Sequence, residues 1–344
     1  MVPRHKAGVE TPDETSARLR LGLACGALYI ANVVLHALVF AKRNPTRRPS
    51  RQNTLLMVCR LLFGVPVNIV VGAWLATWIL IGQIINRPLW KPTTLPLPNE
   101  LHASVAMCGG GFRTWYHLGI YWGMYDALGV DGIKKVKFSG ASIGALVATV
   151  AACGVHPADI WAHIPAIAEA YRGAAFFGHL TKVGQFCRYL LHCTLPADAH
   201  MRVKGRLFIS ISSLLPVPHN HIQSEFTSRE DLIDAVIAAG YIPTWTHPGL
   251  CLHRGMICVD GGVTNNLPAL SEDSLRIGLD AEDISAWNAD LVPSKPLARI
   301  NTFIPADEAN LQRMLNCGKD DIRTWLATPA GRVFVETVQS TESC

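Results

Sequence analysis

Two long runs without a charged residue lie near the start of the chain. Leu61 to Ile85 is the longer run, and at 1.5 Å per helical residue it exceeds the roughly 20 residues that cross a bilayer. Leu21 to Ala41 is also uncharged but contains Asn32 and His36, so it could span the bilayer, lie at its surface or return as half of a hairpin. We therefore expect a membrane-associated helical hairpin over residues 21–90.

Polar segments surround these two runs. Residues 1–20 form a polar tail, and a proline-rich linker over 91–100 precedes a domain that we expect to begin at 101. Six basic residues lie in the loop between the two runs and six lie in the outer flanks, so the positive-inside rule does not set the orientation. Most of the loop's basic residues fall in one stretch: Lys42, Arg43, Arg47, Arg48 and Arg51.

Beyond residue 100 the apolar runs are shorter, and three of them end in a turn rich in glycine. Residues 101–108 have the pattern of a buried strand and are followed by three glycines and a helix-like run over 115–128. Two further strand-like runs, 136–139 and 256–259, are also followed by turns that contain glycine. Open α/β sheets place their functional sites at the carboxyl ends of such strands, so we expect the three turns to form one site.

The first turn consists of Gly109, Gly110 and Gly111. Successive glycines let the backbone approach a ligand and direct its N–H groups at negative charge, and the N-terminus of the following helix adds to this effect. By itself the turn could bind an oxyanion, hold a phosphate or only reverse the chain.

The second turn has the pattern G-x-S-x-G, formed by Gly140, Ser142 and Gly144. A nucleophilic serine between a strand and a helix sits in a strained turn with little space around it, which explains small residues two positions away on either side. Because glycine and serine are common, the motif alone is weak. An alanine- and valine-rich run to Ala152 predicts the helix that follows.

The third turn, D-G-G, supplies Asp260 as a candidate acid for Ser142. An α/β-hydrolase triad runs serine, acid, histidine along the chain, but the last histidine, His253, precedes Asp260. A triad would therefore have to combine earlier residues, Asp231 or Asp234 with His247 or His253. Because that arrangement leaves Asp260 without a role, a Ser/Asp dyad is the simpler interpretation.

The order G-G-G-x-R, G-x-S-x-G and D-G-G resembles the patatin-like phospholipases over roughly residues 101–305. The similarity is closest to the branch that contains adiponutrin and adipose triglyceride lipase, because five residues follow its G-F-x-x-x-Y-H-x-G pattern: Gly111, Phe112, Tyr116, His117 and Gly119. Three further stretches follow the layout of that branch: Gly205 to Ser213, Ser228 to Pro243 and Asp260 to Pro268.

This resemblance implies a three-layer α/β/α sandwich and a lipid acyl hydrolase of the phospholipase or triacylglycerol lipase type. Ser142 would attack the ester carbonyl and Asp260 would activate it. Amides of Gly109, Gly110 and Gly111 would bind the oxyanion, and no cofactor would be required.

Two positions depart from the family pattern. Thr114 replaces the glycine that follows the basic residue of the first motif, which would distort the turn if the position needs a positive φ. Gly240 replaces a serine or cysteine and is expected to affect packing.

Several other polar residues have structural interpretations. Arg113 could contact a lipid head group or cap the glycine turn through a carboxylate. We expect His117 to be a hydrogen-bonded structural residue, and His219 and His221 to lie in a loop. Neither an HExxH motif nor clustered cysteine and histidine spacing indicates a metal site.

Composition narrows the class of protein further. With 17% charged and 49% hydrophobic residues, the 344-residue chain is unlike a disordered protein or a coiled coil, and its net charge of +5 forms no basic stripe for nucleic acid. Ten cysteines without a CxxC pair, and the absence of an N-x-S/T site, favour reduced thiols and a cytosolic catalytic domain. We expect the protein to lie on an endomembrane or a lipid droplet, with glycerolipids as its partners.

Two alternatives to the hydrolase remain open. A transacylase would differ only in the acceptor of the acyl group, and a non-catalytic membrane or lipid-droplet protein could retain the fold as a binding module. The intact Ser142 and Asp260 favour catalysis. The C-terminal segment 306–344 is expected to form helices around 309–315 and 320–326, with a break at Pro329-Ala330-Gly331, and it carries no predicted chemistry.

Overall fold

The computed structural model describes residues 103–173, 182–214, 219–242, 245–246, 250–280 and 288–341. The chain divides into two units, residues 1–88 and 89–344, and all of the described residues belong to the second. The predicted polar tail, membrane segments and linker lie outside the described residues. Within those residues, no helix is both long enough and apolar enough to cross a membrane.

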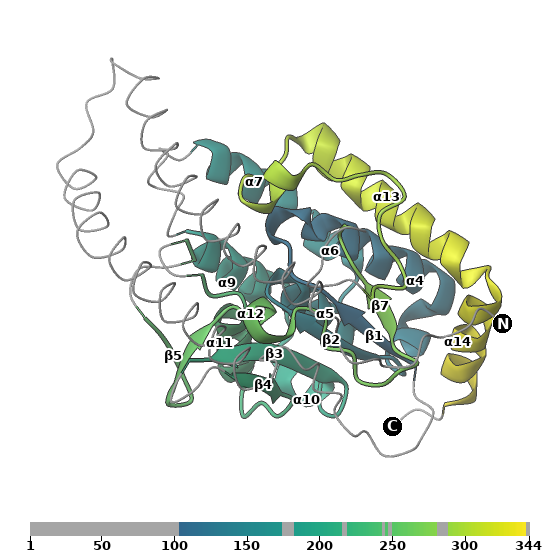
Figure 1. Cartoon of the computed structure of the whole chain (residues 1–344), viewed down its shortest axis with the longest axis horizontal. Coiled ribbons are helices and arrows are strands. Elements are labelled where there is room, and N and C mark those ends of the chain that lie inside the picture. Colours follow the sequence, from purple (N-terminus) through teal and green to yellow (C-terminus); the bar gives the residue numbers. More distant parts are fainter. Residues whose placement is uncertain are drawn as a thin grey trace, which may run out of the picture. The chain divides into compact units, whose positions relative to one another are not determined.

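A seven-stranded mixed sheet forms the centre of the described unit, with strand order β5-β6-β3-β2-β1-β7 and β4 paired to β3 (Figure 1). Strands β1, β2, β3 and β7 are parallel, whereas β4 and β6 run antiparallel to β3. The strands are β1 Ser104–Met107, β2 Lys137–Ala141, β3 Leu207–Ser213, β4 His219–Gln223, β5 Cys251–His253, β6 Met256–Val259 and β7 Leu275–Ile277.

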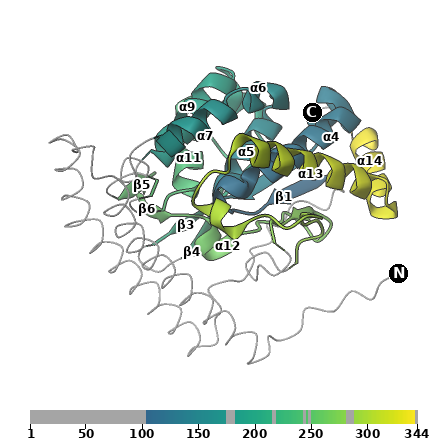
Figure 2. The same cartoon turned by 90° about the horizontal axis from the view of Figure 1, so that it is seen from above.

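Helices flank this sheet, which makes the fold a mixed α/β architecture (Figures 1 and 2). Helix α5 packs on β1, β2 and β3, α11 packs on α5 and β3, and α12 packs on β3 and β4. The α-helices are α4 Trp115–Ile133, α5 Ile143–Ala152, α6 Pro157–Trp161, α7 Ile164–Gly173, α9 Val183–Thr194, α10 Ala199–Arg202, α11 Arg229–Ala239, α12 Gly262–Asn265, α13 Glu308–Leu326 and α14 Pro329–Ser340. Two 3-10 helices are η2 Gly111–Thr114 and η4 Arg299–Thr302.

The predicted strands before the three turns are present, with small shifts at their ends. All four residues of β1 and all seven of β3 are buried, as expected for strands covered on both faces. The run at 256–259 forms β6 as predicted. The first part of α4 ends where expected, because Gly129, with a φ of 67°, is non-helical and separates it by a kink from a short last turn that reaches Ile133. The pattern of apolar residues therefore located these elements well.

Strand register brings the three turns together. Met107 pairs with Gly140 at the ends of β1 and β2, so the glycine turn and the G-x-S-x-G turn leave the sheet side by side. Ser212 of β3 pairs with Val259 of β6, which places Asp260 at the same region of the sheet. Segments more than 100 residues apart therefore meet because their strands are close neighbours in the sheet.

The C-terminal segment differs from the prediction, because α13 is one continuous helix where two short helices were expected. Gly318, within it, packs against α4 so closely that a Cβ atom there would lie 2.2 Å from the Tyr116 carbonyl oxygen. The predicted break is present but lies two residues earlier, because α13 ends at Leu326 and α14 begins at Pro329. Pro329 occupies the first turn of α14, where its missing N–H costs nothing, and Thr328 caps that helix by accepting the Gly331 N–H.

Candidate active site

Ser142 lies at a sharp turn between β2 and α5. Its φ of 53° is in the left-handed region, which is strained for a residue with a Cβ atom. The neighbouring glycines leave space for the turn: a Cβ on Gly140 would lie 2.6 Å from the Ala145 nitrogen, and one on Gly144 would lie 2.5 Å from the Cys108 carbonyl oxygen. The small residues of the motif are therefore required by close backbone packing, as the sequence suggested.

The structure places Ser142 and Asp260 in direct contact. The Ser142 Oγ donates a hydrogen bond to Asp260 Oδ2 at 2.5 Å, and Asp260 Oδ1 accepts a second from the Gly262 N–H at 2.8 Å. Burial raises the pKa of Asp260 from 3.8 to about 6, while these two hydrogen bonds act in the opposite direction. At neutral pH the carboxylate is ionised and adjacent to the hydroxyl proton, which suits a general base.

Buried hydroxyls of β3 hold the loop that carries Asp260. Ser212 Oγ donates to the Asp260 carbonyl oxygen at 2.8 Å and Ser210 Oγ donates to the Asn265 carbonyl oxygen at 2.9 Å. Sequence reasoning missed both serines. Their signal was the alternation along β3, where Ser210 and Ser212 alternate with Ile209 and Ile211. The two serines are thus two positions apart, the period at which side chains share one face of a strand.

The glycine turn lies directly against the serine. A Cβ on Gly109 would lie 2.6 Å from the Ser142 Cβ, and one on Gly111, whose φ is 58°, would lie 1.8 Å from the Thr302 carbonyl oxygen. The Gly109 N–H donates to the Asn266 Oδ1 at 2.9 Å. The turn is thus fixed between η4 and the loop after Asp260, and Asn266 is a further site residue that the sequence analysis did not single out.

The two departures from the family pattern leave the site geometry intact. Thr114 has φ −60° and ψ −14°, ordinary helical values, so its position needs no glycine and the turn is not distorted there. A Cβ on Gly240 would lie 3.7 Å from the Ser142 carbonyl carbon, which is ordinary van der Waals contact. A larger residue would therefore fit there beside the serine.

Arg113 and His117 are buried residues that lie close to the glycine turn. Arg113 is buried with its guanidinium 3.9 Å from Asp280, which favours the capping interpretation over contact with a head group. His117 Nε2 donates to the Cys108 carbonyl oxygen at 3.0 Å, and complete burial lowers its pKa to about 4. A neutral imidazole that is bonded to the backbone at this point has a structural role.

The remaining candidates lie away from Ser142 or outside the described residues. The prediction that His219 and His221 lie in a loop was wrong, because both belong to β4, which pairs with β3. Of the residues weighed for a triad, Asp231 pairs with Arg254, Asp234 pairs with Arg188 and His253 bonds Gln223, while His247 is not among the described residues. Over the described part of the chain, no group of three His, Cys, Asp or Glu side chains could hold a metal ion.

Ser142 and Gly111 of the glycine turn are among the residues that line an apolar cavity. Helices α9 and α11 supply much of its wall, with Trp245 beside them. The apolar side chains from these two helices are Val183, Phe186, Leu190, Val236 and Ile237. A lining of this kind suits a hydrocarbon chain held with its polar end at the serine.

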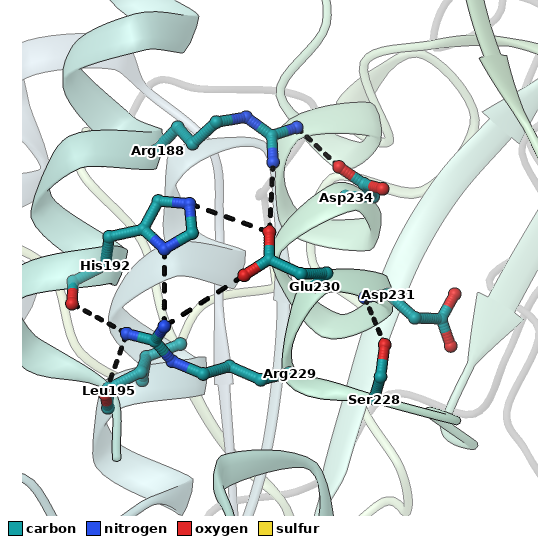
Figure 3. Close-up of polar contacts among 8 residues, drawn as sticks. All are labelled: Arg188, His192, Leu195, Ser228, Arg229, Glu230, Asp231 and Asp234. Carbon is teal, nitrogen blue, oxygen red and sulfur yellow. Dashed lines mark hydrogen bonds and ion pairs between the residues drawn. The ribbon is translucent and has the colours of Figure 1, made fainter. Parts of the chain in front are cut away.

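Polar contacts on the outside hold α9 and α11 together (Figure 3). Arg188 of α9 pairs with Asp234 and lies 3.8 Å from Glu230, both on α11. His192 lies 3.6 Å from Glu230, and Arg229 donates to the His192 carbonyl oxygen at 2.6 Å. Each exposed pair contributes little to stability, so these contacts link the two helices that line the cavity without being the main force that holds them.

A sheet with a serine at a strand-to-helix turn, bonded to a buried carboxylate, places the protein in the class of α/β proteins with a nucleophile elbow. The family model described as patatin-like phospholipase matches residues 105–272. The chain is 31% identical to human patatin-like phospholipase domain-containing protein 4, over 64% of this chain and 94% of that protein. The protein belongs to the patatin-like phospholipase family.

Two further relatives extend the comparison. Human omega-hydroxyceramide transacylase is 30% identical over 64% of this chain and 39% of its own length. Patatin-like phospholipase domain-containing protein 2 of Rattus norvegicus is 31% identical over 50% of this chain and 36% of its own length. The chain therefore spans less than half of these two relatives, and their names include both a phospholipase domain and a transacylase.

Proposed function

We propose that the protein is a lipid acyl hydrolase or transacylase that acts through a Ser142/Asp260 dyad. The observation that carries the proposal is the 2.5 Å hydrogen bond from Ser142 Oγ to a buried carboxylate at the head of an apolar cavity. Membership of the patatin-like family supports the same chemistry. The substrate class would be glycerolipids, whose acyl chain enters the cavity while the ester meets the serine.

In this mechanism Ser142 Oγ attacks the ester carbonyl carbon as its proton passes to Asp260 Oδ2. The oxyanion forms against the glycine turn, where the N–H groups of Gly110 and Gly111 would receive it, since the Gly109 N–H is bonded to Asn266. Collapse of the tetrahedral intermediate expels the alcohol, which takes the proton from Asp260. An acyl-enzyme on Ser142 remains.

The second half of the reaction distinguishes hydrolysis from transfer. Water or a lipid alcohol attacks the acyl carbon and gives its proton to Asp260. The bond to Ser142 Oγ then breaks, Asp260 returns the proton to that oxygen, and a fatty acid or a new ester is released. A relative is named as a transacylase, which supports keeping both outcomes in the proposal. Incubating the protein with a labelled glycerolipid, with and without an added lipid alcohol, and separating fatty acid from new ester measures the partition.

The location of the substrate belongs to the same proposal. A membrane-associated segment over 21–90 would hold the catalytic unit, on the cytosolic side, at an endomembrane or lipid-droplet surface. Tethering would raise the effective concentration of a substrate dissolved in that surface. Fractionating cells that express the full chain, and testing whether alkaline carbonate or only detergent releases it, checks the attachment.

The dyad is tested by labelling the detergent-extracted full chain with a fluorophosphonate probe. We expect Ser142→Ala to abolish labelling and Asp260→Asn to slow it by about 100-fold or more, the usual worth of a general base. The exposed Ser340→Ala is the control and should label like wild type. A well-folded wild-type protein that does not label would instead favour a binding module without catalysis.

A further inference from the structure

Asn266 occupies the point where the three turns of the site meet. Its Oδ1 accepts the Gly109 N–H at 2.9 Å, and a Cβ added to Gly109 would lie 2.9 Å from the same oxygen and 2.6 Å from the Ser142 Cβ. A Cβ added to Gly262 would lie 2.7 Å from this oxygen and 3.0 Å from Asp260 Oδ1. One amide oxygen is therefore adjacent to the oxyanion turn, the serine and the acid.

The element that carries Asn266 is itself firmly held. Helix α12 precedes it directly, and Thr264 of that helix exchanges hydrogen bonds with Ser212 of β3, between the two hydroxyls at 2.8 Å and from the Thr264 N–H at 3.2 Å. Asn220 of β4 donates to Thr264 Oγ1 at 3.0 Å and to Ser210 Oγ at 2.8 Å. Buried, mutually bonded hydroxyls of this kind make a rigid base for the side chain that follows.

We propose that Asn266 is a positioning residue that aligns the oxyanion turn with the Ser142/Asp260 pair by holding the Gly109 N–H. This inference rests on the proposed function. Gly109 directly precedes Gly110 and Gly111, so the direction of its peptide sets the direction of the next two N–H groups. An oxyanion site needs its donors fixed before the charge develops, and a displacement of about 1 Å can cost on the order of 100-fold in rate.

The test compares Asn266→Ala, Asn266→Asp and the exposed Asn316→Ala as control, using a soluble short-chain p-nitrophenyl ester on the full chain. We expect Asn266→Ala to lower kcat about 10- to 100-fold with KM changed less than about 3-fold, because the transition state loses more than the bound ester does. The acidic limb of its pH profile should stay in place, since Asp260 keeps its own partners. Asn316→Ala should match wild type.

Asn266→Asp separates positioning from a general structural role. It keeps an acceptor oxygen for the Gly109 N–H, so at pH 9 its kcat should exceed that of Asn266→Ala by about 5-fold or more. Its new carboxylate would lie beside Asp260, and like charges disfavour ionisation, so its acidic limb should move to higher pH. A merely structural role predicts neither the recovery nor the shift.

The outcomes are distinguishable from failure of the proposed function. If wild type and Ser142→Ala have equal activity, the proposed function fails. If wild type is active and dyad-dependent while folded Asn266→Ala retains its kcat, only the inference about Asn266 is overturned. If Asn266→Ala does not fold, Asn266→Asp decides. The inference is also overturned if folded Asn266→Asp is less active than wild type at pH 7, its acidic limb stays at the wild-type pH, and its activity does not recover at pH 9.

Discussion

At the scale of single residues, Asp260 is subject to two opposing demands. Burial favours the neutral acid, whereas a base for Ser142 must be ionised. Hydrogen bonds from Ser142 and Gly262 offset part of the rise in pKa that burial causes. The resulting pKa of about 6 is close to the pH at which a general base works best. The residue is therefore suited to its proposed role at a cost to the folded state.

This pKa predicts the pH dependence of the reaction. Asp260 accepts a proton only as the carboxylate, so kcat/KM for a soluble ester should rise with pH, reach half of its maximum near pH 6 and level off above about pH 7. A profile measured from pH 4.5 to 9, with circular dichroism to verify the fold at each pH, tests this. A limb centred near pH 4, the ordinary value of an exposed aspartate, would contradict the assignment.

The same pKa predicts a stability effect of Asp260→Asn. The folded pKa of about 6 lies above the ordinary value of 3.8, so the native state binds the proton more tightly and loses stability as the pH rises from about 4 to 6. Well above pH 6, the free energy of unfolding is lower by roughly 3 kcal/mol than it is with Asp260 protonated, at about 1.36 kcal/mol per pKa unit. Because an amide removes the charge but satisfies its neighbours less well, we expect the Asp260→Asn variant to unfold with a free energy about 1–2 kcal/mol above that of wild type at pH 8.

Urea unfolding of wild type and Asp260→Asn at pH 8 and pH 4.5 measures this effect. At pH 4.5 wild-type Asp260 is already protonated, so the advantage of the variant should shrink or vanish. Equal differences at the two pH values would show that the ionisation of Asp260 is not the cause.

At the scale of elements, β1, β2 and α5 pack with almost no space between their backbones near Ser142. Gly144, in the first turn of α5, lies against the carbonyl oxygens of Met107 and Cys108, and the glycine turn continues directly from β1. The geometry of the elbow thus depends on α5 approaching β1 without a side chain between them.

A pair of glycine substitutions tests this dependence. In Gly144→Ala the new Cβ would lie 2.5 Å from the Cys108 carbonyl oxygen, so the helix must move. We expect a loss of about 3 kcal/mol in stability, together with loss of fluorophosphonate labelling. Gly240→Ala is the matched control, because its Cβ would meet nothing closer than 3.7 Å. Thermal unfolding and labelling rates of the two variants should differ sharply; similar behaviour would mean that α5 adjusts freely.

At the scale of the whole described unit, the C-terminal helices pack against the fold that carries Ser142 and Asp260. Helix α13 packs along α4, with a Cβ on Gly119 of α4 placed 2.0 Å from the Leu315 carbonyl oxygen, and the Tyr116 hydroxyl donates to Asp321 at 3.1 Å. The buried apolar residues of α13 are Leu311, Met314, Leu315 and Ile322. The boundary expected at 305 therefore divides a packed pair of helices.

Removing the segment after residue 305 should accordingly unfold or aggregate the catalytic unit. The truncation exposes the face of α4 that α13 covers, including Tyr116 and Gly119, and removes the apolar side chains that pack on it. Expression yield, dye binding to exposed apolar surface and fluorophosphonate labelling measure the result. The exposed Gln312→Ala on α13 serves as the control, and a soluble truncated chain with wild-type labelling would show that α13 is dispensable.

Much of the chemistry and local structure of the site follows from the order of residues alone. Short apolar runs that end in glycine located β1, β2 and β6, and the residues after them included Ser142 and Asp260, because strained turns and close backbone packing permit few residue types. Periodicity is a local property, so it can be read from a single chain without any neighbours. The error at His219 and His221 had another source. The neighbouring Pro216, Pro218 and Asn220 indicated a loop, whereas pairing with β3 makes the segment a strand.

How these residues meet depends on the folded chain. The contact between Ser142 and Asp260 across 118 positions, the bond from Gly109 to Asn266, and the packing of Gly318 on α4 all arise from strand order and helix contact, which no local pattern records. Burial of Asp260, and with it the raised pKa, is likewise a property of the assembled core. Local sequence selects which side chains can react, whereas long-range packing sets their distances, their protonation and the cavity in which they act.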